Sequence, residues 1–466
     1  MYLPRIIDKY LKDWAASEDH KPLMLRGARQ VGKSWSVEHL GEDFKNFIKI
    51  DFEKNPEYIP IFKGNRDVKR IVSQLSVTTS SPIVGGDTLL FLDEIQECPE
   101  AIMALRYFRE DMPELHVIAA GSLLEFALDE LPTFGVARIH SMFMYPMTFD
   151  EFLWATGNQP LYDARKQCSP TNSLPEVLYQ KIVELFRTYI IVGGMPEVVS
   201  KWISTHDYIK CQTLQDDIII GYEADFPKYR KKVNPELLRN TLRSAALQVT
   251  KKFVYSQVRP GWKTEEVKKS LDLLYKAGIL KPVTRTDANG LPLGAEADFS
   301  YRKVLVMDSG LLLRLQNMEL DNSAQTSLTI LTASAADLVN KGPLAEMIAG
   351  LEIDRYMTPN LRHDLYYWVK MTRNSTAEVD YVLPMNGKVM PIEVKADQKG
   401  GMKSLWEFMR AKGLTHAIRS SLENFGEFDY ADAQADGALR HVTICPLYAL
   451  SQLAQCCNCV GAGDTI

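Results

Sequence analysis

The chain has 466 residues, of which 46% are hydrophobic and 24% are charged, and its formal net charge is −5. This composition is that of a folded globular protein rather than a disordered one, and the length predicts two to four domains. Because the chain has no overall positive charge, any nucleic-acid-binding surface has to be a local patch.

The sequence carries no sign of membrane targeting. No uncharged apolar run reaches the ~18 residues of a membrane span, and the N-terminal residues contain no signal-peptide core. Seven cysteines, an odd number at irregular positions, favour a reducing compartment over a disulfide framework. We therefore expect a cytoplasmic protein with no membrane partner. The segment Cys456-Cys457-Asn458-Cys459 resembles half of a zinc site, but no second ligand pair has suitable spacing.

A phosphate-binding loop is predicted near the N-terminus. A helix is expected over 3–14, with Arg5 facing solvent or a bound nucleotide, and it precedes an apolar strand over 23–25. A GxxxxGK[ST] pattern follows, in which glycines allow the tight bends that aim backbone N–H groups at phosphates. The residues expected to bind the nucleotide are Gly27, Ala28, Arg29, Gln30, Val31, Gly32, Lys33 and Ser34. Lys33 is expected to reach the β- and γ-phosphates, and Ser34 is expected to bind Mg²⁺.

Two carboxylates follow the next buried strand. The continuous apolar run over 88–92 is typical of a central strand in a parallel sheet, and it ends in Asp93-Glu94, 60 residues after Lys33. Ligands bind at the carboxyl ends of such strands. We expect Asp93 to hold Mg²⁺ through water and Glu94 to orient and polarise the attacking water. The alternative is a solvated acidic turn.

Two further polar residues are candidates because of their positions alone. Ser122 follows a strand over 117–120, where it either senses the γ-phosphate or caps the next helix. Arg138 precedes a fifth strand and is either an arginine finger for a neighbouring subunit or a surface residue in an ordinary ion pair. The alternation of strands and helices predicts an α/β P-loop domain over 1–158, with a parallel sheet between two helical layers.

Five motifs, in this order, resemble those of one prokaryotic family: GARQVGKS, LLFLDEIQ, IAAGS, MYPMTFDEFL and GGMPEVV. The family consists of AAA-type P-loop ATPases whose C-terminal half is a domain of unknown function. The resemblance covers nearly the whole chain and implies ATP binding, while the cellular role of the family is largely unestablished. Trp35 departs from the family, in which a smaller or aliphatic residue follows the Walker serine.

The middle of the chain is predicted to be helical. Polar residues and prolines over 159–173 indicate an exposed linker or an insertion. The helices over 175–235 form a helical lid in the family that the chain resembles. The pair Gly193-Gly194 in this segment is either a hinge or a tight turn between helices.

A winged helix is predicted over 236–335, because two helices are followed by a β-hairpin, and the resemblance implies the same. Positive charge on its expected recognition helix fits phosphate contacts with DNA or RNA. Protein docking and an ordinary solvated face are the alternatives. The lysines concerned are Lys263, Lys268, Lys269 and Lys276.

The C-terminal third combines carboxylates and a lysine. A helix carries Glu346, a strand carries Asp380, and the next strand carries Glu393 and Lys395. This order resembles the site of PD-(D/E)XK nucleases and implies an α/β restriction-endonuclease-like domain over 336–455. The three carboxylates would bind Mg²⁺, and the lysine, on the same face of its strand as Glu393, would activate water. The alternatives are a solvated hairpin face and a nuclease-like fold that binds without cleaving.

These features lead to two hypotheses on function. In the first, the chain is an ATPase that couples Mg²⁺-dependent hydrolysis to a DNA- or RNA-directed C-terminal module. In the second, ATP controls a protein-binding switch whose nuclease-like fold is inactive. If Arg138 acts in trans, the chain also forms a homo-oligomer that depends on ATP.

Overall fold

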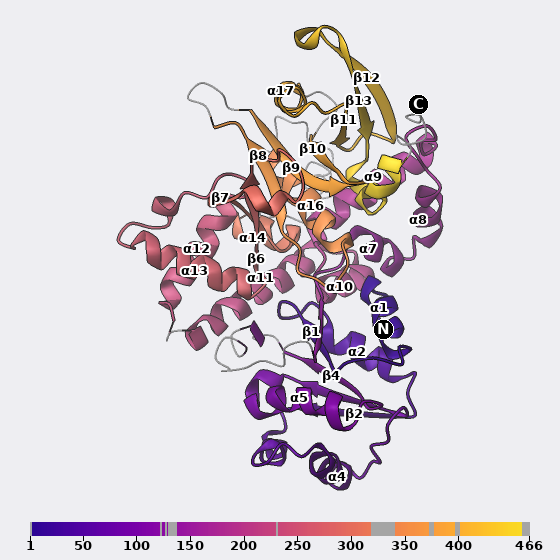
Figure 1. Cartoon of the computed structure of the whole chain (residues 1–466), viewed down its shortest axis with the longest axis vertical. Coiled ribbons are helices and arrows are strands. Elements are labelled where there is room, and N and C mark those ends of the chain that lie inside the picture. The colour runs from indigo at the N-terminus through magenta and orange to yellow at the C-terminus, as the bar shows by residue number, and fades with distance from the viewer. Residues whose placement is uncertain are drawn as a thin grey trace. The chain divides into compact units, whose positions relative to one another are not determined.

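The computed structural model divides into two compact units (Figure 1). The first comprises Met1–Met147 with the short segments Lys276–Ile279 and Thr358–Arg362, and the second comprises the rest of the chain. The structure describes residues 2–121, 124–125, 128, 138–229, 232–317, 341–371, 377–396 and 401–458. Within these ranges, no helix has both the length and the apolar character needed to cross a membrane.

The first unit is built on a five-stranded sheet with the order β2-β3-β4-β1-β5. Every neighbouring pair of strands is parallel, which confirms the predicted parallel α/β sheet. The carboxyl ends of β1, β4 and β3 therefore lie side by side along one edge. The strands are β1 (Leu23–Arg26), β2 (Asn46–Asp51), β3 (Thr88–Asp93), β4 (His116–Ala120) and β5 (His140–Phe143).

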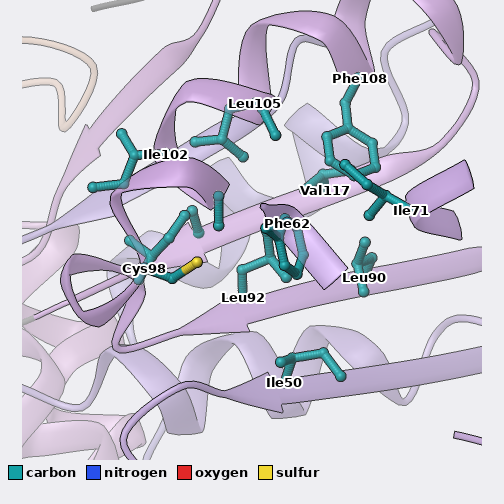
Figure 2. Close-up of a cluster of buried hydrophobic side chains, with 14 of the residues drawn as sticks. Ile50, Phe62, Ile71, Leu90, Leu92, Cys98, Ile102, Leu105, Phe108 and Val117 are labelled. Carbon is teal, nitrogen blue, oxygen red and sulfur yellow. The ribbon is translucent and has the colours of Figure 1, made fainter. Parts of the chain in front are cut away.

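Helices cover both faces of this sheet. Successive strand residues point to opposite faces, and every residue of β3 and β4 is buried, so both faces need a covering layer. On one face, Ile50, Leu90 and Leu92 pack in a buried cluster with side chains of α4 and α5 (Figure 2). On the other face, α2 lies against β2, where a Cβ atom added to Gly41 would come within 2.5 Å of the Phe47 ring. The helices are α1 (Ile6–Ala15), α2 (Lys33–Gly41), α3 (Ile59–Phe62), α4 (Val68–Thr78) and α5 (Pro99–Asp111).

The second unit begins with helices. One of them, α8, lies where the sequence predicted an exposed linker or insertion. The segment predicted to be an exposed linker contains α8, whose Arg165 is 0% exposed and lies 2.7 Å from the Asp150 carboxylate. A helix that is anchored by a buried ion pair lacks the apolar stripe by which helices are predicted. The helices are α7 (Phe149–Ala155), α8 (Gln159–Lys166), α9 (Glu176–Val192), α10 (Pro196–Thr205) and α11 (Tyr208–Asp225).

We expect the change Arg165→Met to lower the free energy of unfolding of the second unit by about 3–5 kcal/mol, because it leaves Asp150 buried without its counter-ion. Urea titrations followed by tryptophan fluorescence measure this loss. The change Lys181→Met is the control, since Lys181 is an exposed lysine on α9. A loss below about 1 kcal/mol for Arg165→Met would contradict a buried pair of this kind.

The glycine pair between α9 and α10 is held by Asp308. The Gly194 N–H donates to Asp308 Oδ2 at 2.6 Å, and a Cβ atom on Gly193, where φ is 75°, would lie 2.2 Å from Asp308 Oδ1. The same carboxylate accepts a hydrogen bond from the Leu311 N–H at 3.0 Å and caps α14 (Ser309–Leu315). These contacts favour a tight turn over a hinge.

A single eight-stranded sheet organises the rest of the second unit, with the order β12-β13-β11-β10-β9-β8-β6-β7. The hairpin β6-β7, predicted as the wing, pairs with β8 and so belongs to the same sheet as the C-terminal strands. The strands are β6 (Leu280–Thr286), β7 (Ala297–Val306), β8 (Leu365–Val369), β9 (Glu378–Met385), β10 (Lys388–Val394), β11 (His416–Ser420), β12 (Gly426–Asp432) and β13 (Ala438–Ile444). The accompanying helices are α12 (Pro235–Leu247), α13 (Thr264–Lys276), α16 (Lys341–Tyr356), α17 (Lys403–Lys412) and α18 (Leu453–Asn458). The division of this unit into lid, winged helix and nuclease-like domain stays a prediction.

Candidate functional site

The loop between β1 and α2 has the backbone bends of a phosphate-binding loop. Gly32 precedes α2 in a left-handed conformation, with φ at 98°. Gly27 has φ at 147°, and a Cβ atom there would lie 2.1 Å from the Met144 carbonyl oxygen. Both positions therefore require glycine. The bends bring the loop to the N-terminus of α2, where free N–H groups and the helix dipole favour an anion.

Arg5, the residue immediately before α1, supports this loop. Its side chain is buried, and it donates hydrogen bonds to the carbonyl oxygens of Val31 and Tyr145, both at 2.7 Å. The expectation that Arg5 faces solvent is therefore wrong. The two acceptor residues are 26 and 140 positions away from Arg5 in the sequence, so the periodicity of the helix could not indicate these contacts.

Lys33 folds back onto its own loop. Its ammonium group donates to the carbonyl oxygens of Gly27 at 2.9 Å and Ala28 at 2.7 Å. Burial lowers the pKa of Lys33 to about 8, and the nearby carboxylates of Glu94 and Asp93 oppose this shift. Bound phosphate oxygens would give the ammonium group the negative partners that carbonyl groups supply only in part.

A hydrogen bond joins the loop to the end of β3. Ser34 Oγ donates to Asp93 Oδ2 at 2.8 Å, which places together the two residues predicted to serve Mg²⁺. Lys49 of β2 lies 3.0 Å from the same oxygen and 2.8 Å from Glu38 Oε1. Lys49 could not be selected from the sequence, because a lysine near the end of an edge strand has no distinguishing pattern.

Glu94 is held in a specific orientation immediately after β3. Its φ of 47° is unusual for a residue with a side chain, and Gln96 donates to its Oε2 at 2.6 Å. Backbone strain of this kind is common at functional sites. The sequence analysis assigned no role to Gln96, although it belongs to the LLFLDEIQ motif.

The remaining two predicted residues of this site have different outcomes. Ser122 lies outside the described residues. Arg138 is exposed, and its Nε lies 2.5 Å from Glu110. It precedes β5 by two residues, whereas Phe143 at the other end of β5 pairs with Arg26, next to the loop. Because β5 is parallel to β1, Arg138 lies toward the amino end of β5, away from the edge of the sheet that carries the loop. A role as an arginine finger would have to be in trans.

The four predicted C-terminal residues occupy one region of the second unit. Tyr381 of β9 pairs with Ile392 of β10, and this register places Asp380 beside Glu393. Asp380 Oδ2 accepts a hydrogen bond from the Val394 N–H at 2.8 Å, and Lys395 lies 2.6 Å from Glu393 Oε1.

Two more charged residues, which the sequence analysis did not select, belong to this region. One carboxylate oxygen from each of Glu346, Glu378 and Asp380 lies within 4.8 Å of the others. Lys303 of β7 is 1% exposed, lies 2.7 Å from Glu346 Oε1 and forms an ion pair with Glu378. We call these four residues together with Glu393 and Lys395 the carboxylate cluster.

Burial controls the protonation of this cluster. It raises the pKa of Glu346 to about 8, against the attraction of Lys303, and it raises the pKa of Glu393 to about 7, with Asp380 adding to the shift. Burial alone would lower the pKa of Lys303, but the surrounding carboxylates outweigh it and raise that pKa. The lysine is therefore charged at neutral pH.

Three domain models match successive parts of the chain. Residues 19–153 match an AAA domain, residues 183–322 match a domain of unknown function (DUF8612), and residues 341–448 match another domain of unknown function (DUF4143). Together with the parallel sheet and the loop geometry, the first match shows that the chain contains an AAA-type P-loop domain, which supports ATP binding.

Solved structures give weaker likenesses. The Walker-type ATPase PABY2304 of Pyrococcus abyssi is 15% identical with a TM-score of 0.42, over 68% of this chain and 96% of that chain. A signal transduction ATPase with numerous domains (STAND), the protein PH0952 of Pyrococcus horikoshii with a tetratricopeptide repeat sensor, is 8% identical with a TM-score of 0.25. That match covers 73% of this chain and 47% of the other. Likenesses this low bear on neither fold nor function. No curated protein matches the chain.

Proposed function

We propose that the first unit hydrolyses ATP with the help of Mg²⁺. The observation that carries this proposal is the hydrogen bond between Ser34 and Asp93, because it joins the two halves of a metal site at the end of a phosphate-binding loop. Lys33 neutralises the β- and γ-phosphates, Ser34 and Asp93 hold Mg²⁺, and Glu94 orients the attacking water. The AAA domain match over 19–153 supports the same function.

Removal of the metal tests this proposal in the wild-type chain. We expect phosphate release from ATP with Mg²⁺ present, and loss of that release when EDTA is in excess, because the ion neutralises charge that develops in the transition state. A colorimetric phosphate assay measures both rates. Hydrolysis that continues unchanged in EDTA would contradict a role for Mg²⁺.

We further propose that α13 and β7 form a contact surface for single-stranded nucleic acid. A cavity of about 490 Å³ lies between them, lined among others by Tyr255, Lys268, Phe299 and Arg302. The Phe299 ring is 63% exposed, with the Arg302 guanidinium group 5.3 Å from its centre. Exposed rings stack on bases, while nearby cations contact phosphates.

The charge around this surface favours the same partner. Although the whole chain has a net charge of −5, the segment 251–269 contains only Glu265 and Glu266 as acidic residues. Its basic residues outnumber these and are Lys251, Lys252, Arg259, Lys263, Lys268 and Lys269. This excess of basic residues is the local positive charge that a nucleic-acid contact requires in an acidic chain, and Asp272, which also lines the cavity, lies 3.8 Å from Arg302.

The change Phe299→Ala tests this surface. Loss of one stacking ring weakens binding to a single-stranded oligonucleotide by roughly tenfold, since stacking contributes about 1–3 kcal/mol per base. Fluorescence anisotropy at low salt measures the affinity. Leu291→Ala, at an exposed residue of the same hairpin, is the matched control and should bind normally. If wild type and Phe299→Ala bind DNA and RNA oligonucleotides equally, this surface is not the contact.

The ATPase rate separates the two hypotheses on the second unit. If that unit is directed to nucleic acid, the oligonucleotide changes the rate of ATP hydrolysis. If the chain is instead a nucleotide-controlled protein-binding switch, the rate is slow and the oligonucleotide does not affect it. Cleavage of phosphodiesters by the carboxylate cluster stays a prediction, which assays of DNA and RNA cleavage with and without Asp380→Ala test.

A further inference from the structure

A buried ammonium group lies inside the carboxylate cluster. Lys303 comes from β7, whereas Glu346 comes from α16 and Glu378 comes from β9. The ammonium group is bonded to both glutamates, and it lies 4.8 Å from the centre of the Tyr367 ring. These contacts come from three directions and leave the side chain no access to solvent. The positive charge is therefore a fixed part of the cluster.

This ammonium group and a divalent cation would compete for the same oxygens. Mg²⁺ requires its carboxylate ligands at about 2.0–2.1 Å in near-octahedral geometry, and a carboxylate oriented toward an ammonium group does not meet that requirement. An ion bound beside Lys303 would also face a like charge in a region of low dielectric constant. The side of the cluster formed by Glu346 and Glu378 therefore does not fit a metal ion.

The side formed by Asp380 and Glu393 does fit one. Glu393 is 4% exposed, and its Oε1 is bonded to Lys395. The Lys395 side chain is 25% exposed, so, unlike the buried Lys303, it can turn toward solvent when an ion binds. Its Oε2 is buried and has no hydrogen-bond partner among the described residues. A buried carboxylate oxygen without a partner is costly unless a cation or proton meets it. Asp380 precedes Tyr381, which pairs with Ile392, so Asp380 lies beside Glu393 across the β9–β10 pair and offers a second oxygen ligand.

We propose that Lys303 takes the place of a metal ion at Glu346 and Glu378, so that the cluster binds a single divalent cation, at Asp380 and Glu393. Glu346 then partners a tethered cation instead of ligating a metal, and Lys303 limits the number of ions. A site with one ion lacks the two-metal clamp that holds both the attacking and the leaving oxygen in many nucleases. The inference concerns the second unit and does not depend on ATP hydrolysis by the first.

Binding of Mn²⁺ to the full-length chain without nucleotide tests the proposal. Titration calorimetry of wild type, Glu346→Gln and Asp380→Asn gives the number of bound ions and their affinity. Any binding at Ser34 and Asp93 is common to all three proteins and cancels in the comparison. We expect Asp380→Asn to lose one Mn²⁺ and Glu346→Gln to keep it.

The change Lys303→Met tests the tethered cation itself. We expect this variant to bind one more Mn²⁺ than wild type, and we expect Mn²⁺ to raise its Tm more than it raises that of wild type. If the variant does not fold, the comparison of Glu346→Gln with Asp380→Asn still decides. The proposal is overturned if Glu346→Gln loses Mn²⁺ as Asp380→Asn does, if Asp380→Asn loses none, or if folded Lys303→Met binds no more than wild type.

Discussion

Replacement of Lys33 by alanine will lower the affinity for ATP about 100-fold. Lys33 is the buried cation of the phosphate-binding loop, and among the described residues it donates hydrogen bonds to the carbonyl oxygens of Gly27 and Ala28. A charge-assisted contact with phosphate in such a site contributes on the order of 3 kcal/mol, which corresponds to about 100-fold in affinity. Titration with a fluorescent ATP analogue measures the change.

The matched control is Lys45→Ala, at an exposed lysine of the same unit whose partner is Asp87. We expect this variant to bind ATP as wild type does, because exposed ion pairs contribute little. Equal affinity of Lys33→Ala and Lys45→Ala would remove the loop from the nucleotide site.

Replacement of Glu94 by glutamine will lower kcat for ATP hydrolysis by about 10²–10⁴-fold while ATP still binds. Glutamine has nearly the same shape but cannot accept a proton, so the water-activating step is lost and the phosphate contacts remain. The bond from Gln96 to Glu94 Oε2 and the positive φ of Glu94 hold the carboxylate for this task. Steady-state phosphate release and analogue binding, measured on the same preparation, separate the two effects.

Glu97→Gln provides the control for that experiment, because Glu97 is an exposed carboxylate at the end of the same turn. Its kcat should equal that of wild type. If Glu94→Gln retains full turnover, another group activates the water, and the assignment of Glu94 is wrong.

Local patterns predicted much of the fold correctly. The strand predicted over 117–120 lies within β4, and the apolar run that ends in Asp93 is a central strand of the sheet. In each case the signal lies within a few consecutive residues, because burial of a strand on both faces makes all of them apolar. The phosphate-binding loop was predictable for a similar reason, since its glycines stand where the backbone requires them.

Contacts between distant segments were not predictable in this way. The helix α8 lies in a polar segment and is held by the buried ion pair of Arg165 with Asp150. Lys303 belongs to a cluster whose other members follow it in the sequence by 43 residues or more. Buried charged residues look like surface residues in a sequence, because only the fold shows which partner meets each charge.

The most direct test of the central claim, that the loop and the end of β3 form one Mg·ATP site, is a crystal structure with Mg²⁺ and a non-hydrolysable ATP analogue. The account predicts that Lys33 leaves the Gly27 and Ala28 carbonyl oxygens for the β- and γ-phosphates, with Mg²⁺ between Ser34 and Asp93. It is contradicted if the analogue binds elsewhere, or if Lys33 keeps its present contacts while the analogue is bound.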